Sequence, residues 1–500
     1  MKAIKYIFAA LAFVIVAATP VRAQLFSSND INYHSFRSPM ATKLNPALFP
    51  ENSKFYVSMT RIDFDLSLPL GFSDVIMHDN EGAVIRLDTL MSKLTPDGKH
   101  MGARIGFNLQ TDFLGFGFRV KDMYFNFGWG FNMNTSINIP LNTLRLLSDG
   151  NFGEFGREGN VTDINLGDDN ILRTQTYMHY SLGFAMKIPK TDATVGLRLN
   201  LLNGIQMVAV DKLGIHLITD TANTRLMATT DLYAYTAGII PLMNAAKGTF
   251  STDELTSTMD IKSLWNSFKQ YLPKSLGFTF DLGAKYEWKN FVFSASILDL
   301  GPGIHWTQNP LQLSTKGSDT VSFEGIDLNR IMNSGTVDTS YTNSLRDSLM
   351  ALLDTSMSAN KYWYAVPTKV YLGASYSLNH MLRVAAMFHC EFEPAKKGKL
   401  IFRQSTNLSV HFSLFDWLEL AVGNSFTFDG KTPDPWNPAA SISFNIGRVF
   451  QMYATMDYLS DFRLAKAKAA HVYLGLNIVG YTKPHKAKIS SYGDTHLEVE

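Results

Sequence analysis

The stretch DMYFNFGWGFNMN, residues 122–134, alternates strictly between large apolar residues and small or polar ones. Side chains of a β-strand point to its two faces in turn, so a single face carries every second residue: Met123, Phe125, Phe127, Trp129, Phe131 and Met133. The same alternation precedes this stretch in residues 101–110 and 114–120, across links of only a few residues. The region therefore predicts a meander of long strands, each with one aromatic-rich apolar face.

Alternation of this kind continues through most of the chain. Clear runs occupy residues 54–61, 62–70, 174–188, 194–201, 275–288, 291–298, 368–378, 381–392, 400–414, 418–428, 440–446, 450–458 and 471–479, and weaker runs occupy 205–218 and 224–235. Tight links such as 379–380 alternate with long ones such as 429–438, which is typical of outer-membrane barrels with short periplasmic turns and long outer loops. The pattern predicts an all-β transmembrane antiparallel barrel of about sixteen strands, with both chain ends periplasmic.

A soluble all-β protein is the alternative explanation of this alternation. Soluble strands average about five or six residues, whereas a strand that crosses a bilayer needs roughly nine to eleven. Many runs here reach the longer length, and their polar faces carry Gly, Asn and Ser rather than the Lys and Glu of a solvent-exposed face. These features favour the membrane barrel.

The start of the chain has the features of a secretory signal. Lys2 and Lys5 precede an apolar stretch over residues 7–18, and Val21-Arg22-Ala23 fits a small-x-small cleavage site. The expected organisation is therefore a signal peptide at 1–23, a plug-like periplasmic segment at 24–53, a barrel at 54–481 and a polar tail at 482–500.

Composition restricts the environment of the mature chain. A single cysteine rules out an intrachain disulfide framework, and a formal charge of +1 gives no bulk attraction toward nucleic acid. An exported, aromatic-rich and strand-rich chain indicates the bacterial outer membrane. We expect a monomer in contact with outer-membrane lipid and lipopolysaccharide, with an outer-membrane protein as a possible partner.

Several short motifs carry a resemblance to a known family. LGFGFR at 114–119, YFNF at 124–127, SDGN at 148–151, YSLGF at 180–184 and VGLRL at 195–199 occur in the order of an uncharacterised family of outer-membrane barrels, domain of unknown function 5723. From about Asn45 to the end of the strands, the chain resembles this family.

A more distant resemblance involves Asn45, Pro46 and Ala47, which are similar to the Asn-Pro-Ala element of FadL-type fatty-acid channels. In that family the element begins a small hatch that plugs a fourteen-strand barrel. The resemblance implies fourteen strands where the alternation counts about sixteen. An ordinary turn is the alternative, because Asn-Pro favours turn initiation.

Known catalytic and metal-binding motifs are absent from the sequence. It contains no His-x-x-x-His pair, no Gly-x-Ser-x-Gly element and no Walker-type phosphate loop. We therefore expect no enzyme, no cofactor and no metal, although Ser, His and an acid could still be assembled across strands.

Charged residues lie opposite the apolar face on several predicted strands: Arg104, Arg119, Arg198, Arg383, His389, Glu391, Arg403 and His411. These lumen candidates have two interpretations. They could line a path for a polar solute, or they could form an internal network that holds a hatch and stiffens the wall, because enclosed charges need partners in either case.

Two predicted outer loops contain short helical patterns with apolar stripes. One stripe consists of Leu264, Trp265 and Phe268, and the other of Leu345, Leu349 and Leu352. Each could form a reception groove for a lipid-like ligand, could dock a partner protein, or could pack on its own loop or on the barrel rim.

The functional expectation is passive uptake of a small, hydrophobic molecule through the barrel. Residues 24–50 would fold inside and obstruct the pore, with Ser38, Asn45 and Asn52 bonding to lumen groups such as Arg104 and Arg119. The alternative is an outer-membrane scaffold or anchor for a surface or secretion complex, which transports nothing.

Overall fold

The computed structural model describes the following residues: 29–50, 53–68, 76–79, 82–85, 103–140, 142–143, 146, 157–158, 161–220, 225–239, 274–315, 321–323, 355–393, 396–397, 400–415, 417–427, 437–447, 449–459 and 469–481. The predicted signal peptide, both loop stripes and the polar tail lie outside these residues. Among the described helices, none has the length and hydropathy needed to cross a membrane.

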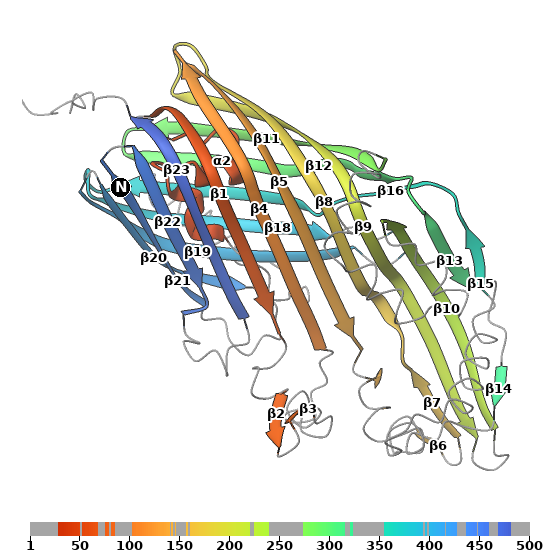
Figure 1. Cartoon of the computed structure of the whole chain (residues 1–500). Helices are drawn as coiled ribbons and strands as arrows, with labels where there is room; N and C mark the ends of the chain where they lie inside the picture. Colours follow the sequence, from red (N-terminus) through yellow and green to blue (C-terminus); the bar gives the residue numbers. More distant parts are fainter. Residues whose placement is uncertain are drawn as a thin grey trace, which may run out of the picture.

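Fourteen of the described strands form one closed antiparallel barrel (Figure 1). In ring order they are β1 (Ser53–Ser67), β4 (Ala103–Val120), β5 (Met123–Ile139), β8 (Asp168–Lys187), β9 (Ala193–Asp220), β11 (Leu276–Trp288), β12 (Phe291–Trp306), β17 (Thr368–Ser377), β18 (Leu382–Glu393), β19 (Ile401–Phe415), β20 (Leu418–Thr427), β21 (Asn437–Ile446), β22 (Phe450–Asp457) and β23 (Ala469–Tyr481). Pairing of β1 with β23, from Ser53↔Tyr481 to Ser67↔Ala469, closes the ring. Both the all-β class and the closed antiparallel barrel are confirmed.

Fourteen is the strand number that the FadL-type resemblance implies, whereas the count of about sixteen from alternation alone is too high. β1 and β4 are single strands, each of which the alternation divides in two. Irregularities in register, at Ser58/Thr60 in β1 and at Asp112/Leu114 in β4, shift the alternation by one residue. A bulge adds one unpaired residue and reverses which side chains point inward. In the sequence such a reversal resembles a short link between two strands.

The two weak runs, 205–218 and 224–235, add no further strand to the barrel. Residues 194–201 and 205–218 belong to one strand, β9, which has 28 residues. The run at 224–235 lies in β10 (Arg225–Gly238), which pairs with the distal half of β9 and stands outside the closed ring. Joining the two halves of β1 and the two halves of β4 reduces the sixteen clear runs to fourteen strands, and the two weak runs add none.

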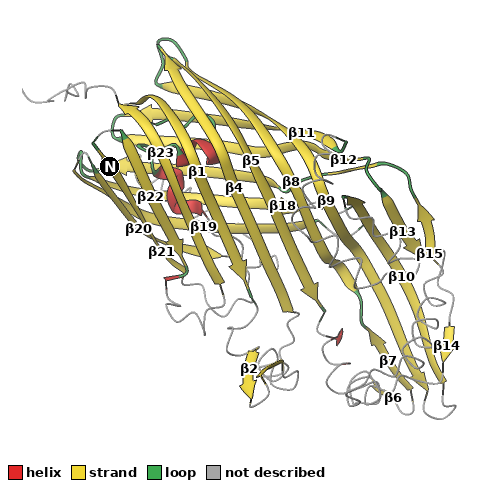
Figure 2. Cartoon of the chain, viewed as in Figure 1, coloured by secondary structure: helices red, strands yellow, loops and turns green. Residues whose placement is uncertain are grey.

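Further strands, most of them short, extend the sheet beyond the ring, toward the long-loop end of the barrel (Figure 2). They are β6 (Arg157–Glu158), β7 (Val161–Asn165), β10, β13 (Leu311–Thr315), β14 (Val321–Phe323), β15 (Thr355–Ser358) and β16 (Tyr362–Tyr364). A separate hairpin pairs β2 (Ile76–Asp79) with β3 (Gly82–Ile85). At about 3.3 Å per residue β9 alone spans roughly 90 Å, far more than a bilayer core.

The two faces of the barrel wall differ sharply in polarity. On β5, burial alternates so that Tyr124, Asn126 and Gly128 face inward, while Phe125 and Phe127 face outward. Large apolar side chains are exposed on the outer face of neighbouring strands as well, among them Phe116, Leu182, Leu197 and Leu372. The predicted apolar face is therefore the outer face, which lipid would cover in a membrane.

Phe127→Arg tests this face. The residue lies a few positions from the short turn at 121–122, where the middle of the apolar band is expected, so a guanidinium there should cost about 2 to 4 kcal/mol of unfolding free energy. Val120→Arg, on the same outer face next to that turn, should cost about 1 kcal/mol or less. Urea unfolding in lipid micelles measures both, and equal costs would contradict the assignment.

Residues 29–50 lie inside the barrel, and we call them the luminal segment. Its two short helices are η1 (Asn29–His34) and α2 (Met40–Leu44), and Figure 1 shows them enclosed by the strands near the short-turn end. Nearly all of its described side chains are buried, including Ile31, Tyr33 and Leu48.

Candidate functional site

The Asn-Pro-Ala element lies against the inner face of β11 and β12. The side-chain amide of Asn45 donates to the backbone oxygens of Ala284 at 3.3 Å and Ala295 at 3.1 Å, and to Tyr33 Oη at 3.0 Å. Its Oδ1 accepts a bond from Ala47 N at 2.8 Å, which closes a local turn. A single side chain thus fixes the turn and attaches it to two strands of the wall.

Two glycines of the wall make room for this element. A Cβ on Gly283 of β11 would lie 2.1 Å from Oδ1 of Asn45, and a Cβ on Gly196 of β9 would lie 2.4 Å from the carbonyl carbon of Pro46. Any larger residue at either position would displace the element. The wall therefore contains a shaped seat for residues 45–47.

Backbone carbonyls at the end of α2 are bound by the wall as well. Arg198 of β9 donates to the oxygens of Thr42 and Lys43, each at 2.8 Å, and Ser296 of β12 donates to Leu44 O at 2.6 Å. The last carbonyls of a helix lack intrahelical partners, so these donors satisfy them. Asp281, 2.5 Å from Nε of Arg198, holds the guanidinium in place.

Two other arginines of the wall contact the luminal segment near its ends. Arg119 of β4 donates to Pro50 O at 3.0 Å and lies 4.3 Å from the ring centre of Phe49. Arg383 of β18 donates to His34 O at 3.2 Å and lies 4.4 Å from the ring centre of Phe36. Each combines a charge-assisted hydrogen bond with a cation–π contact.

Apolar contacts complete the attachment. Tyr33 stacks on Tyr371 with ring centres 5.7 Å apart, and Phe49 stacks on Tyr124 at 5.1 Å. One buried cluster joins the segment to the wall through Tyr33, Phe36, Ala41, Leu48, Leu298, Tyr371 and Met387. The luminal segment thus supplies more than half of the residues of this cluster.

A buried carboxylate connects the segment to three further groups. Asp112, at the bulge of β4, lies 2.8 Å from Nζ of Lys43, 3.0 Å from Nε of Arg61 and 3.2 Å from Nε2 of His179. The side chains of Asp112 and Arg61 are at most 4% exposed. Because Lys43 belongs to α2, the luminal segment also takes part in a buried charge network of the wall.

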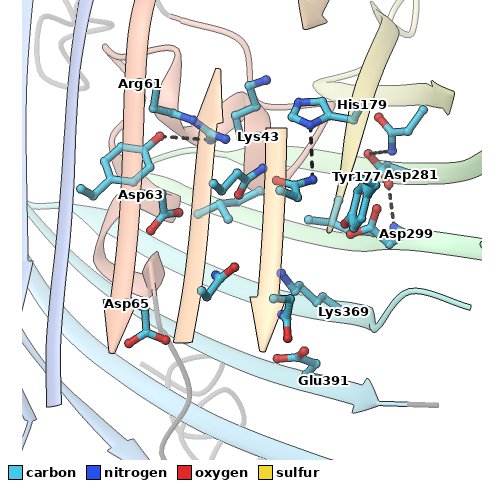
Figure 3. A pocket seen from close by; sticks show the side chains of 18 of the residues that line it. Lys43, Arg61, Asp63, Asp65, Tyr177, His179, Asp281, Asp299, Lys369 and Glu391 are labelled. Carbon is cyan, nitrogen blue, oxygen red and sulfur yellow. Dashed lines mark hydrogen bonds between the residues drawn. The ribbon is translucent and has the colours of Figure 1, made fainter. Parts of the chain in front are cut away.

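A polar cavity of about 140 Å³ lies on the long-loop side of the luminal segment. Lys43 and Leu44 form part of its floor, and Figure 3 shows Asp63, Asp65 and Glu391 among the side chains around it. At about 10–15 Å³ per water, this space holds on the order of ten waters. It is large enough for a small solute.

The lumen candidates fall into three groups. Arg119, Arg198 and Arg383 bind the luminal segment, whereas Glu391 and Arg403 line the cavity, as Arg198 also does. His389 stacks on Tyr371 with ring centres 4.2 Å apart, and His411 lies 3.2 Å from Ser409 Oγ. Arg104 is in β4, but its side chain is outside the described residues.

Some expected partners of the segment were wrong. Ser38 bonds to Gln451 rather than to an arginine, and Arg119 binds a backbone oxygen. Asn45 bonds to strand carbonyls, while Asn52 lies outside the described residues.

Sequence reasoning missed the charged residues of β1. Arg61, Asp63 and Asp65 occupy alternate positions between Ile62, Phe64 and Leu66, a signal that lay within two runs already predicted as strands. It also missed His471, whose two ring nitrogens lie 2.9 Å from Asp63 and 2.8 Å from Asp457. That contact joins β1, β22 and β23 where the ring closes.

Residues 46–457 match the model of a family described as Family of unknown function (DUF5723). The chain belongs to this family. The predicted membership is thus confirmed, and the matched part of this DUF5723 chain begins at Pro46, within the seated element, and ends with β22. No curated protein matches the sequence.

Three solved structures similar to this DUF5723 chain are distant in sequence. The toluene transporter TbuX of Ralstonia pickettii is 12% identical, with 88% of this chain and 92% of that chain covered and a TM-score of 0.37. A FadL homologue of Pseudomonas aeruginosa is 10% identical, with 92% and 100% covered and a TM-score of 0.40. The toluene transporter TodX of Pseudomonas putida is 10% identical, with 92% and 94% covered and a TM-score of 0.33.

Proposed function

We propose that this DUF5723 chain is an outer-membrane channel that its own luminal segment closes and that passes a small molecule when the segment moves. The observation that carries this proposal is the seat of Asn45, Pro46 and Ala47 between two wall glycines. The wall holds the luminal segment through hydrogen bonds that involve side chains of the segment or of the wall. The described elements of the segment are short helices, which are not strands of the barrel sheet. Such an attachment can release as a unit while the barrel ladder stays intact.

The outer membrane as location is supported by the outward apolar face and by the secretory signal in the sequence. A closed barrel satisfies every strand hydrogen bond internally, which lipid requires of a spanning structure. The short turns and the luminal segment lie at one end, which we assign to the periplasm.

The lining of the cavity favours a polar cargo over the hydrophobic one expected from the sequence. Asp63, Asp65 and Glu391 bring carboxylates to this space, and Lys369 and Arg403 bring cationic groups. A hydrocarbon placed there would strip water from charged groups without replacing their hydrogen bonds, which is unfavourable. A small polar molecule can replace those bonds.

Asn45→Ala is the direct test of the channel. The substitution removes the donor to Ala284 O and Ala295 O and the acceptor for Ala47 N, each worth about 1 kcal/mol net. Release of the segment should therefore become at least about tenfold more frequent. Single-channel recordings of the refolded protein should show open events at least tenfold more often than in the wild type.

The matched control is Asn379→Ala, whose side chain bonds to Met381 N and Leu382 N within its own short turn. It should leave the recordings unchanged. Liposome swelling with sugars, amino acids and toluene identifies the cargo class that passes. An Asn45→Ala barrel that folds and conducts no more than the wild type would contradict the channel.

The sheet beyond the ring favours a second candidate, a non-transporting scaffold. β9, β10, β13 and β15 carry hydrogen-bonded structure well past the length that a bilayer needs, on the long-loop side. Such a projection offers a surface for another protein. A folded barrel that passes no solute even without its luminal segment would favour the scaffold.

A further inference from the structure

Most charged groups around the cavity have partners of opposite sign. Lys43 and Arg61 pair with Asp112, while Arg198 pairs with Asp281. Arg403 pairs with Glu393, and Asp63 pairs with His471. The groups left over decide what the cavity attracts.

Asp65 is the clearest of these remaining groups. It lies on β1, lines the cavity and is 5% exposed. Its Oδ1 is buried and has no hydrogen-bond partner in the described part of the chain. A buried carboxylate oxygen without a donor is costly, so its presence at a cavity indicates a donor beyond those that the described residues supply.

Two further strands of the wall, β17 and β18, add charged groups to the cavity. Glu391 of β18 is 6% exposed and lies directly across from Lys369 of β17 in the strand pairing. Within the described residues, neither side chain forms a hydrogen bond or an ion pair, and both line the cavity (Figure 3). A third carboxylate, Asp299 of β12, accepts a bond from Thr279 and has no paired cation within ion-pair distance in the described part.

The lining groups outside these ion pairs are therefore three carboxylates and one ammonium group, while Lys43 and Arg61 share the single carboxylate of Asp112. Asp65, Glu391 and Asp299 supply acceptors, and the ammonium group of Lys369 lies across from Glu391 in the strand pairing. Enclosure by protein strengthens attraction between unlike charges relative to bulk water. The buried Oδ1 of Asp65, which lacks a donor in the described part of the chain, therefore favours a ligand that brings positive charge and hydrogen-bond donors.

We propose that this cavity binds a small organic cation with a primary ammonium or guanidinium group, held by Asp65 and Glu391. Such a group brings several donors, which a carboxylate pair accepts. In the described ranges, His, Cys, Asp and Glu side chains form no cluster of three or more suited to a metal ion, which favours an organic cation. The proposal deepens the channel function by naming its cargo class, but binding can be measured without transport.

The test uses three probes of one length, namely putrescine, 1,4-butanediol and succinate. Titration calorimetry of the full chain in detergent should give binding heat for putrescine, with at least tenfold weaker affinity for the neutral diol and for the dianion. Asp65→Asn and Glu391→Gln, which keep shape and remove charge, should each weaken putrescine binding at least tenfold.

Asp122→Asn is the matched control, because Asp122 lies exposed in the short turn at the opposite end of the barrel. It should bind putrescine like the wild type. Magnesium chloride at equal concentration should not compete, which separates an organic site from a general ionic one.

Several results would overturn the site. These are equal binding of putrescine and the diol, unchanged affinity in both carboxylate variants, or no putrescine binding to a folded wild type. Folding of each variant is checked by heat-resistant mobility on a gel, and either variant alone suffices if the other fails to fold. A wild type that binds no putrescine yet opens on Asn45→Ala would remove the site and keep the channel.

Discussion

Deleting residues 24–50 is expected to turn a closed barrel into one with a severalfold larger and sustained conductance. An eight-strand barrel is filled by its own side chains, but a fourteen-strand barrel is wider and needs other material to close it. Here that material is the luminal segment, which supplies Tyr33, Phe36 and Leu48 to the interior core. Planar-bilayer conductance of the refolded deletion measures the effect.

Removal of residues 482–500, a segment of similar length after β23, serves as the control and should leave conductance unchanged. Gly196→Val tests the same idea without a deletion. The valine side chain would occupy the space that the Pro46 backbone fills and would therefore displace the luminal segment. It should give partial opening. Gly214→Ala is the control, because a Cβ at Gly214 would lie 3.3 Å from Cβ of Asp231, in the part of the sheet beyond the ring, and it should give no opening. An unchanged conductance from a heat-resistant deletion barrel would mean that the segment does not close the pore.

Asp112→Ala is expected to lower the free energy of unfolding by about 3 to 5 kcal/mol. The change leaves Arg61 buried without its carboxylate and removes the partner of Lys43 and of His179. Loss of one member of a buried ion pair is costly because the remaining charge stays away from water. Urea titration in micelles, followed by tryptophan fluorescence, measures the loss.

An exposed ion pair provides the comparison. Asp231 pairs with Lys212 in the outer sheet, where both side chains are more than a third exposed, so Asp231→Ala should cost less than about 1 kcal/mol. The double variant Asp112→Ala with Arg61→Met should recover part of the loss, because no guanidinium remains unpaired. A cost at Asp112 as small as that at Asp231 would exclude the buried network.

Local alternation was enough to predict the barrel. The side-chain parity of a strand is a property of neighbouring residues, so residues 122–134 reveal a strand with one apolar face. Parity also places Arg119, Arg198 and Arg383 on the inner face, where the structure has them. The strand number was not accessible in this way, because one extra residue at 112–114 reverses parity without ending β4.

From the sequence alone, the barrel class and the inward-facing side chains could therefore be predicted, and an export signal is expected. Only the tertiary structure decided what those side chains do. Asn45 meets Ala284, which lies 239 residues further along the chain, and Arg198 meets Thr42 across 156 residues. Asp65 likewise reaches the cavity beside Glu391 only because the closed ring brings β1 and β18 around one space. Contacts across a lumen depend on how the ring closes and on the register of its strands. The alternation of apolar and polar residues along one strand carries no information on either.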